Sequence, residues 1–235
     1  MATSANSTCE PSDKDLRESI MKKPLTNSDL ITTAKDFCLE SHTYSELFGV
    51  TDGKAIGTFI EHKFRERLEA LYAVEIGSSA LGIDLPSVET DIKVTSIRQP
   101  QSSCPFRSAR QKVYGLGYHL LLFVYDKQDN QQDQTAILSF ISCAFINKTR
   151  TADYQTTRGI LEILSRDGNR DDITGFLADR NLPGDEIVYS TLADEIMQSP
   201  PVLGYLTISN ALQWRLQYSR VVNLTETVSG IVKII

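Results

Sequence analysis

The sequence predicts an α/β protein in which a central mixed sheet is flanked by helices, with further elements at both ends. Helical and strand patterns follow one another in the order helix, strands, helix, strands, which is typical of a mixed α/β core. The hydrophobic fraction of 41% and the charged fraction of 23% are those of an ordinary globular protein. The length of 235 residues fits one domain with a sizeable core.

The N-terminal part of the chain carries two helical patterns. Residues 1–50 are expected to form a peripheral arm, in which residues 29–40 have the pattern of a short amphipathic helix. From about residue 54 to about residue 76, apolar residues recur at spacings of three and four, which predicts a longer helix. The sequence Gly77-Ser78-Ser79 ends it. Residues 51–235 are expected to form the main domain.

The middle of the chain alternates between strand and helix patterns. Pro86 and Ser87 separate two β-favouring runs within residues 80–96, so a hairpin or an abrupt turn between strands is expected there. Residues 105–115 are compatible with a helix, residues 118–125 form an apolar buried strand, and residues 135–146 form a strand after a polar turn at 126–133. Another helix is expected over residues 154–164, and loops surround short elements further on.

The charge of the chain is unevenly distributed. The net charge of −6 argues by itself against a nucleic-acid-binding protein, because Lys and Arg supply most of the sequence-independent affinity for phosphates. Between Ile92 and Tyr125, however, there is no Asp or Glu, while this segment holds Lys93, Arg98, Arg107, Arg110 and Lys112. A local basic stretch inside an acidic protein is a candidate contact for nucleic acid.

The cysteines and the N terminus bear on the location of the protein. The four cysteines are far apart and show no CxxC or Cys/His spacing, which indicates neither a zinc site nor a disulfide framework. The N terminus is polar and acidic, unlike a signal peptide, and no apolar run approaches the roughly 20 residues that a spanning helix needs. We therefore expect a cytoplasmic protein with free thiols and no membrane segment.

The triplet Asp91-Ile92-Lys93 carries the chemistry. Residues two apart on a strand point to the same side, so Asp91 and Lys93 would project together while Ile92 points into the core. The turn expected before this strand would fold Asp84 back beside Asp91. Two carboxylates and one ammonium at a sheet edge suit phosphodiester hydrolysis, in which carboxylate-held Mg²⁺ activates water and stabilises charge on the phosphate and the leaving oxygen.

Asp84, followed on the next strand by Asp91-Ile92-Lys93, resembles the PD-(D/E)xK motif of restriction endonucleases and related DNA repair nucleases. The resemblance covers residues 54–146, whose expected elements follow the order of that restriction-endonuclease-like core. It implies that Asp84 and Asp91 are Mg²⁺ ligands, and that Lys93 orients or activates the attacking water and stabilises the transition state. It also implies a homodimer, since one active site per strand matches the symmetry of a palindromic site.

The motif departs from the family pattern at its first acid. Gly82-Ile83 stands where a Pro is customary, and the two acids are close in sequence, so Glu75 or Glu89 is an alternative first acid. Glu61 corresponds to a helical acid that contacts the metal through water in several family members, but an i, i+4 pair with Arg65 explains it equally well. Two histidines are expected to be partly buried structural residues rather than bases or ligands: His62 and His119.

Two segments are candidates for DNA contact. The first follows the catalytic strand and is rich in side chains that suit phosphates and base edges: Arg98, Gln99, Gln101, Ser102, Ser103, Arg107, Arg110 and Lys112. The second spans residues 207–220, where Gln213, Arg215 and Gln217 alternate as the exposed side chains of a strand would. A helix that buries Leu212 and Leu216 is the alternative for this second segment.

The resemblance and these candidates together predict a type II restriction endonuclease that uses Mg²⁺ to hydrolyse phosphodiester bonds in double-stranded DNA at a short specific sequence. A repair or recombination nuclease of the same fold, which recognises DNA structure instead of sequence, is the nearest alternative. The others are a sequence-specific DNA-binding protein without catalysis and a protein-interaction domain without DNA affinity.

Overall fold

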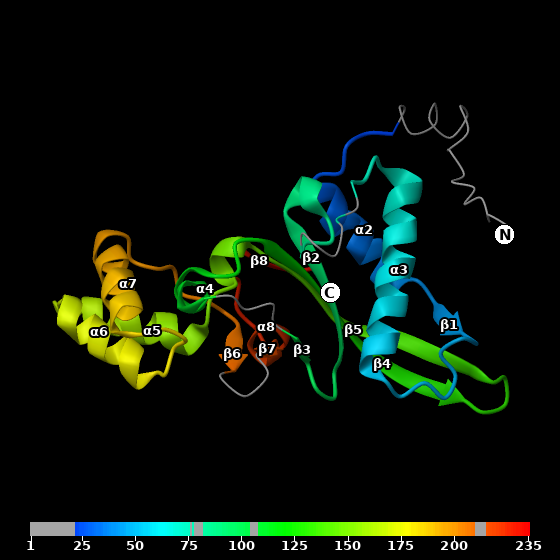
Figure 1. Ribbon diagram of the computed structural model, residues 1–235. Helices are drawn as coiled ribbons and strands as arrows, with labels where there is room; N and C mark the ends of the chain where they lie inside the picture. The colour runs from blue at the N-terminus through cyan, green and yellow to red at the C-terminus, as the bar shows by residue number, and fades with distance from the viewer. Residues whose placement is uncertain (1–21, 76, 78–81, 104–107, 210–214) are drawn as a thin grey trace, which may run out of the picture.

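The computed structural model describes residues 22–75, 77, 82–103, 108–209 and 215–235. Its main sheet has the strand order β1-β5-β4-β2, and β8 pairs with β5. These strands are β1 (His42–Tyr44), β2 (Thr90–Ser96), β4 (His119–Asn130), β5 (Thr135–Ile146) and β8 (Ile231–Lys233). β2 and β4 are parallel, whereas the other pairs are antiparallel. The predicted α/β fold with a central mixed sheet flanked by helices is confirmed (Figure 1).

Two N-terminal helices, α2 (Asn27–Leu39) and α3 (Gly53–Leu71), pack against one face of this sheet. The buried positions of α3 recur mostly every four residues, as its sequence predicts: Ile56, Ile60, Phe64 and Leu68. α3 ends five residues earlier than expected, because Tyr72 is extended and Ala73 N donates a hydrogen bond to Lys23 O. α2 and β1, in the expected peripheral arm, pack into this same core, so the described part of that segment does not lie apart.

β4 is buried on both faces, which explains its continuous apolar run. Leu121 and Phe123 face the cluster formed with α2 and α3, whereas Leu120, Leu122 and Val124 belong to a second cluster on the other face. β4 continues to Asn130 by pairing with β5, so residues 126–130 are strand and only residues 131–134 form the turn that was predicted over 126–133. Residues 126–130 were predicted to be part of the turn because all of them are polar.

A small second sheet has the order β3-β7-β6, with β3 (Gln101–Ser103), β6 (Thr207–Ser209) and β7 (Arg215–Gln217). The remaining helices are α4 (Ala109–Tyr114), α5 (Tyr154–Leu164), α6 (Arg170–Asp179), α7 (Glu186–Gln198) and α8 (Ser219–Val222). α5 matches its predicted bounds. Figure 1 shows α5, α6 and α7 gathered at one end of the molecule, and α3 with β1 at the other. Among the described helices, none has the length and apolar character that crossing a membrane requires.

Candidate active site

A short turn before β2 brings two acids of the motif together. The 3-10 turn Pro86–Val88 and the left-handed Glu89 (φ 47°) allow Leu85 to pair with Thr90, through hydrogen bonds of 2.9 and 3.1 Å. Asp84 then lies beside the start of β2, where its Oδ2 accepts a hydrogen bond of 2.8 Å from Ile92 N. Since β2 is the last strand of its sheet, Asp84 caps a main-chain donor on the open edge.

Asp91 and Lys93 project from β2 to the same side, while Ile92 is buried in the core. Asp91 Oδ2 lies 2.5 Å from Lys93 Nζ, but it is buried and accepts no hydrogen bond of regular geometry from the residues that the structure describes. Burial raises the pKa of Asp91 to about 7, against the lowering effect of the Lys93 ammonium and with a further rise from the Asp84 carboxylate. The buried Asp91 carboxylate is therefore held between the Lys93 ammonium and the Asp84 carboxylate.

Arg65 on α3 joins two of the acids. Its Nη2 lies 2.6 Å from Glu61 Oε1 and also contacts Asp84 Oδ1. The Arg65 side chain is only 18% exposed, so solvent screens these ion pairs weakly. Burial and the Asp84 carboxylate raise the pKa of Glu61, while Arg65 and Lys93 lower it. The expected i, i+4 pair of Glu61 with Arg65 is present, and Glu61 lies in the same charged cluster as Asp84. Its contact with a metal ion through water stays a prediction.

The donor set of this cluster suits a hard cation. Asp84 and Asp91 offer carboxylate oxygens, the ligands that Mg²⁺ prefers, and the buried Oδ2 of Asp91 accepts no hydrogen bond of regular geometry from the described residues. No ready-made group of three or more acids, histidines or cysteines is gathered for a metal within the described ranges. Arg65 and Lys93 instead neutralise the acids. The residues therefore fit a cation held by Asp84 and Asp91, with Arg65 giving up its contact with Asp84.

The alternative first acids lie elsewhere. Glu89 forms an exposed ion pair with Lys148 at 2.7 Å, and Glu75 is exposed after the end of α3. The structure thus brings Asp84 beside Asp91, and it brings neither Glu75 nor Glu89 there. His119 is buried and its Nδ1 accepts a hydrogen bond of 2.9 Å from Lys148 N, which fits the expected structural role. His62, expected to be partly buried, is exposed.

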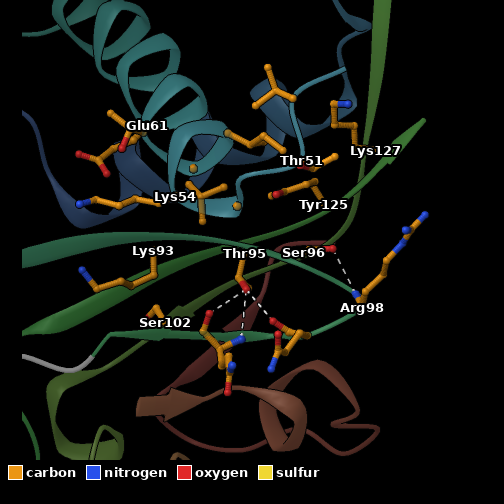
Figure 2. Close-up of a pocket in the computed structure, with 18 of the residues that line it drawn as sticks. Thr51, Lys54, Glu61, Lys93, Thr95, Ser96, Arg98, Ser102, Tyr125 and Lys127 are labelled. Atoms are coloured by element: carbon orange, nitrogen blue, oxygen red, sulfur yellow. Dashed lines mark hydrogen bonds between the residues drawn. The ribbon is translucent and has the colours of Figure 1, made fainter. Parts of the chain in front are cut away.

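A cleft of about 840 Å³ runs along β2; Glu61 and Lys93 of the charged cluster line it, whereas Asp84 and Asp91 are not among its lining residues. Figure 2 shows Glu61 and Lys54 on α3 at one side of the cleft, and Lys93 and Thr95 on β2 at the other. Six of the expected DNA contacts line it: Arg98, Gln99, Gln101, Ser102, Ser103 and Arg215. Lys54 and Lys127 also line it. Sequence analysis missed these two lysines, since neither lies in a basic segment; only their place at the cleft reveals them.

The two candidate DNA-contact segments form one surface. In the small sheet, Gln101 of β3 pairs with Gln217 of β7, and Ser103 pairs with Arg215. These side chains share one face, because Leu216 between them is buried on the other face. The strand alternative for this part of the C-terminal segment is therefore confirmed. Two of the candidates, Arg107 and Gln213, lie outside the described residues, as does Leu212.

The Thr95 hydroxyl ties this surface to β2. Its Oγ1 lies 3.1 Å from Gln99 O and 3.0 Å from Gln101 O, and accepts a hydrogen bond of 3.1 Å from Gln101 N (Figure 2). One side chain of β2 thus holds both ends of the turn between β2 and β3. The position of Gln99 and Gln101 in the cleft follows directly from the strand that carries Asp91 and Lys93.

Comparison with known proteins identifies the family. The profile of the family "Type II restriction enzyme NspV" matches residues 24–233. The Type II restriction enzyme NspV of Nostoc sp. (strain ATCC 29411 / PCC 7524) is 54% identical over 212 residues, which cover 89% of this chain and 96% of that protein. The chain belongs to the NspV family of type II restriction enzymes. No solved structure matches it. The predicted type II restriction endonuclease, a site-specific deoxyribonuclease, is thereby confirmed.

Two basic residues of this NspV-family chain are not brought to the cleft. Arg110 on α4 pairs with Glu195 of α7, with 2.6 Å between Nη2 and Oε1. Lys112 on the same helix is buried, at 5% exposure. Both were expected to contact DNA. α4 packs through Ala109 and Val113 against the helices at the far end of the molecule, and Lys112 lines a cavity beside β6 instead of the cleft. The segment without acids, residues 92–125, therefore contributes to two parts of the structure. Only one of these parts borders the cleft.

Proposed function

We propose that this chain cleaves double-stranded DNA at a short specific sequence with Mg²⁺ held by Asp84 and Asp91, and that it acts as a homodimer in the cytoplasm. Family membership supports cleavage at a specific sequence. The observation that carries the site is the buried carboxylate of Asp91, which lies beside Asp84 and has its Oδ2 at 2.5 Å from Lys93 Nζ. The buried free thiols of Cys38 and Cys143 agree with a reducing compartment.

Each residue of the cluster has a separate task. When bound, Mg²⁺ supplies an activated water and neutralises charge on the phosphate. Asp84 is held in place by Ile92 N, so its carboxylate keeps a fixed direction. Lys93 lines the cleft, where its ammonium orients the attacking water and stabilises negative charge developing on the phosphate. Asp91 gives up a proton near neutral pH, because burial holds its pKa near 7.

Digestion of an unmodified plasmid of known sequence tests the proposal. We expect discrete bands in Mg²⁺, none in EDTA, and the same sequence at every cut end. A product that depends on nicks or branches instead would indicate a repair nuclease. Binding to one sequence without cleavage in Mg²⁺ would indicate a non-catalytic DNA-binding protein. Sedimentation with a palindromic duplex should give two protein chains per duplex, since two active sites are needed to cut both strands.

The polar face of the small sheet should determine specificity more than affinity. We expect Gln101→Ala and Arg215→Ala each to reduce discrimination between the cognate sequence and single-base variants by about 10- to 100-fold, since a bidentate base contact contributes roughly 1 to 3 kcal/mol. Cleavage rates on cognate and altered duplexes give the measurement. Gln198→Ala, an exposed change at the end of α7, is the control. Unchanged discrimination in both variants would move base recognition away from this sheet.

Arg65 should compete with the metal ion. We expect Arg65→Gln to unfold at lower temperature without divalent ions, because Glu61 and Asp84 lose their shared cation, and to bind Ca²⁺ about tenfold more tightly, a coupling of roughly 1.4 kcal/mol. Calorimetry and thermal unfolding with and without Ca²⁺ measure both effects. Arg67→Gln is the matched control, since Arg67 pairs with Glu40 away from the cluster. Weaker Ca²⁺ binding by Arg65→Gln would show that Arg65 assists the metal instead.

A further inference from the structure

Three arginine side chains from different parts of the chain line one cavity. Arg158 belongs to α5, Arg180 directly follows α6, and Arg220 belongs to α8. The cavity has a volume of about 290 Å³, and Tyr154 forms part of its wall. This cavity is separate from the catalytic cleft, with which it shares none of its lining residues.

The cavity is positively charged. Glu162 is the one acid among the described residues that line it, and it pairs with Arg158 at 2.7 Å. Both side chains of this pair are well exposed, at 61% and 49%, so water screens the pair and a stronger partner can replace Glu162. Three arginines and one glutamate give the lining a formal charge of +2, in a protein whose net charge is −6.

Aromatic and amide groups hold two of these arginines in place. The Arg220 guanidinium lies 3.5 Å from the centre of the Tyr154 ring. The Arg180 guanidinium lies 5.1 Å from the centre of the Phe176 ring, and its Nη1 donates a hydrogen bond of 3.3 Å to Gln155 Oε1. Side chains that are already ordered lose less entropy when a ligand binds. Guanidinium groups match the oxygen pairs of phosphate, so the cavity suits a phosphate group.

Polar surface connects this cavity to the catalytic cleft. Gln155 and Arg180 also line a neighbouring cavity of about 330 Å³, whose other wall includes β6 and Gln217 of β7. Gln217 pairs in turn with Gln101, which lines the catalytic cleft. A path therefore leads from the charged cluster, across the polar face of the small sheet, to the three arginines.

We infer that the cavity of Arg158, Arg180 and Arg220 binds a phosphate of the DNA backbone outside the recognised sequence. The inference rests on the proposed function, since it takes duplex DNA as the substrate. A duplex seated on the small sheet continues beyond it and carries one negative charge per roughly 1.7 Å of its axis. A phosphate contact at the cavity adds affinity and fixes the direction of the duplex, and it carries no sequence information.

The test compares the parent with the double variant Arg158→Gln, Arg220→Gln on two duplexes in EDTA. Both duplexes contain the recognised sequence; one ends close to it and the other has long flanks. On the long duplex, we expect the variant to bind at least about tenfold more weakly, with a slope of log K against log salt reduced by about 0.9, because one phosphate contact is lost. On the short duplex, both proteins should bind equally, and in Mg²⁺ they should cleave at equal rates.

A control variant and two contrary outcomes make the test decisive. Arg166→Gln removes an exposed arginine after α5 that lies outside the cavity, and it should behave like the parent. Equal binding of the long duplex by the parent and the double variant would overturn the inference. Equal losses on both duplexes would also overturn it, because the arginines would then contact the recognised sequence. Cleavage of the short duplex by the parent tests the proposed function separately.

Discussion

Asp91→Ala should abolish DNA cleavage and leave sequence-specific binding largely intact. The change removes the buried carboxylate that faces Lys93 and lies beside Asp84, but it removes no residue of the polar face on the small sheet. Cleavage in Mg²⁺ and binding in EDTA, measured on the same duplex, separate the two effects. Asp36→Ala, an exposed change on α2, is the control. Substantial residual cleavage would mean that another acid holds the metal.

The pH dependence of thermal unfolding shows whether a variant at Asp91 is folded. The pKa of Asp91 is about 7 in the folded protein and roughly 4 in the unfolded chain. Between these values the unfolded chain releases the proton while the folded protein keeps it, so Asp91 weakens the parent's fold as the pH rises from about 4 to about 7. Asp91→Asn should therefore unfold at a higher temperature relative to the parent at pH 8 than at pH 4. If Asp91→Asn unfolded at a lower temperature than the parent at both pH values, a loss of cleavage in this variant would be due to misfolding.

Lys93→Ala should slow cleavage by about four orders of magnitude without changing the sequence that is cut. Orientation of the attacking water and stabilisation of the transition-state charge can each contribute roughly a hundredfold or more. Since the Lys93 ammonium lowers the pKa of Asp91, the variant also holds the Asp91 proton to higher pH. The rate deficit should therefore shrink as the pH rises above 7.

Single-turnover rates from pH 6 to pH 9 measure the effect of Lys93. Lys35→Ala, an exposed change on α2, is the control and should follow the parent at every pH. A change in the sequence that is cut would contradict the proposed role, because Lys93 would then contact bases. A deficit that is the same at every pH would show that Lys93 does not govern the Asp91 proton.

Local sequence patterns were enough for the parts of the site that lie close together in the chain. The strand Thr90–Ser96 and the turn before it follow from Pro86 and from β-favouring residues, so the approach of Asp84 to Asp91 was predictable. Arg65 was recognised only as a partner of Glu61. Its contact with Asp84 depends on how α3 packs on β2, which no local pattern encodes.

The remaining parts depend on contacts between distant segments. The pairing of Ser103 with Arg215 joins two segments that sequence analysis treated as separate DNA-contact candidates, because a strand of three residues carries too little pattern to name its partner. Lys112 appeared to be an exposed basic residue, but it is buried and lines a cavity together with Asp153 and residues of β6. Burial of a long cationic side chain cannot be inferred from charge alone.

The hydrogen bonds of Thr95 fix the distance between Asp91 and the turn that follows β2. Asp91 and Thr95 are four positions apart on one strand, and a strand rises roughly 3.3 Å per residue, so the residue that anchors the turn lies about 13 Å from Asp91. A rigid strand keeps that spacing constant whatever sequence is bound. The distance between Asp91 and the turn that carries Gln99 and Gln101 is therefore a fixed property of the fold.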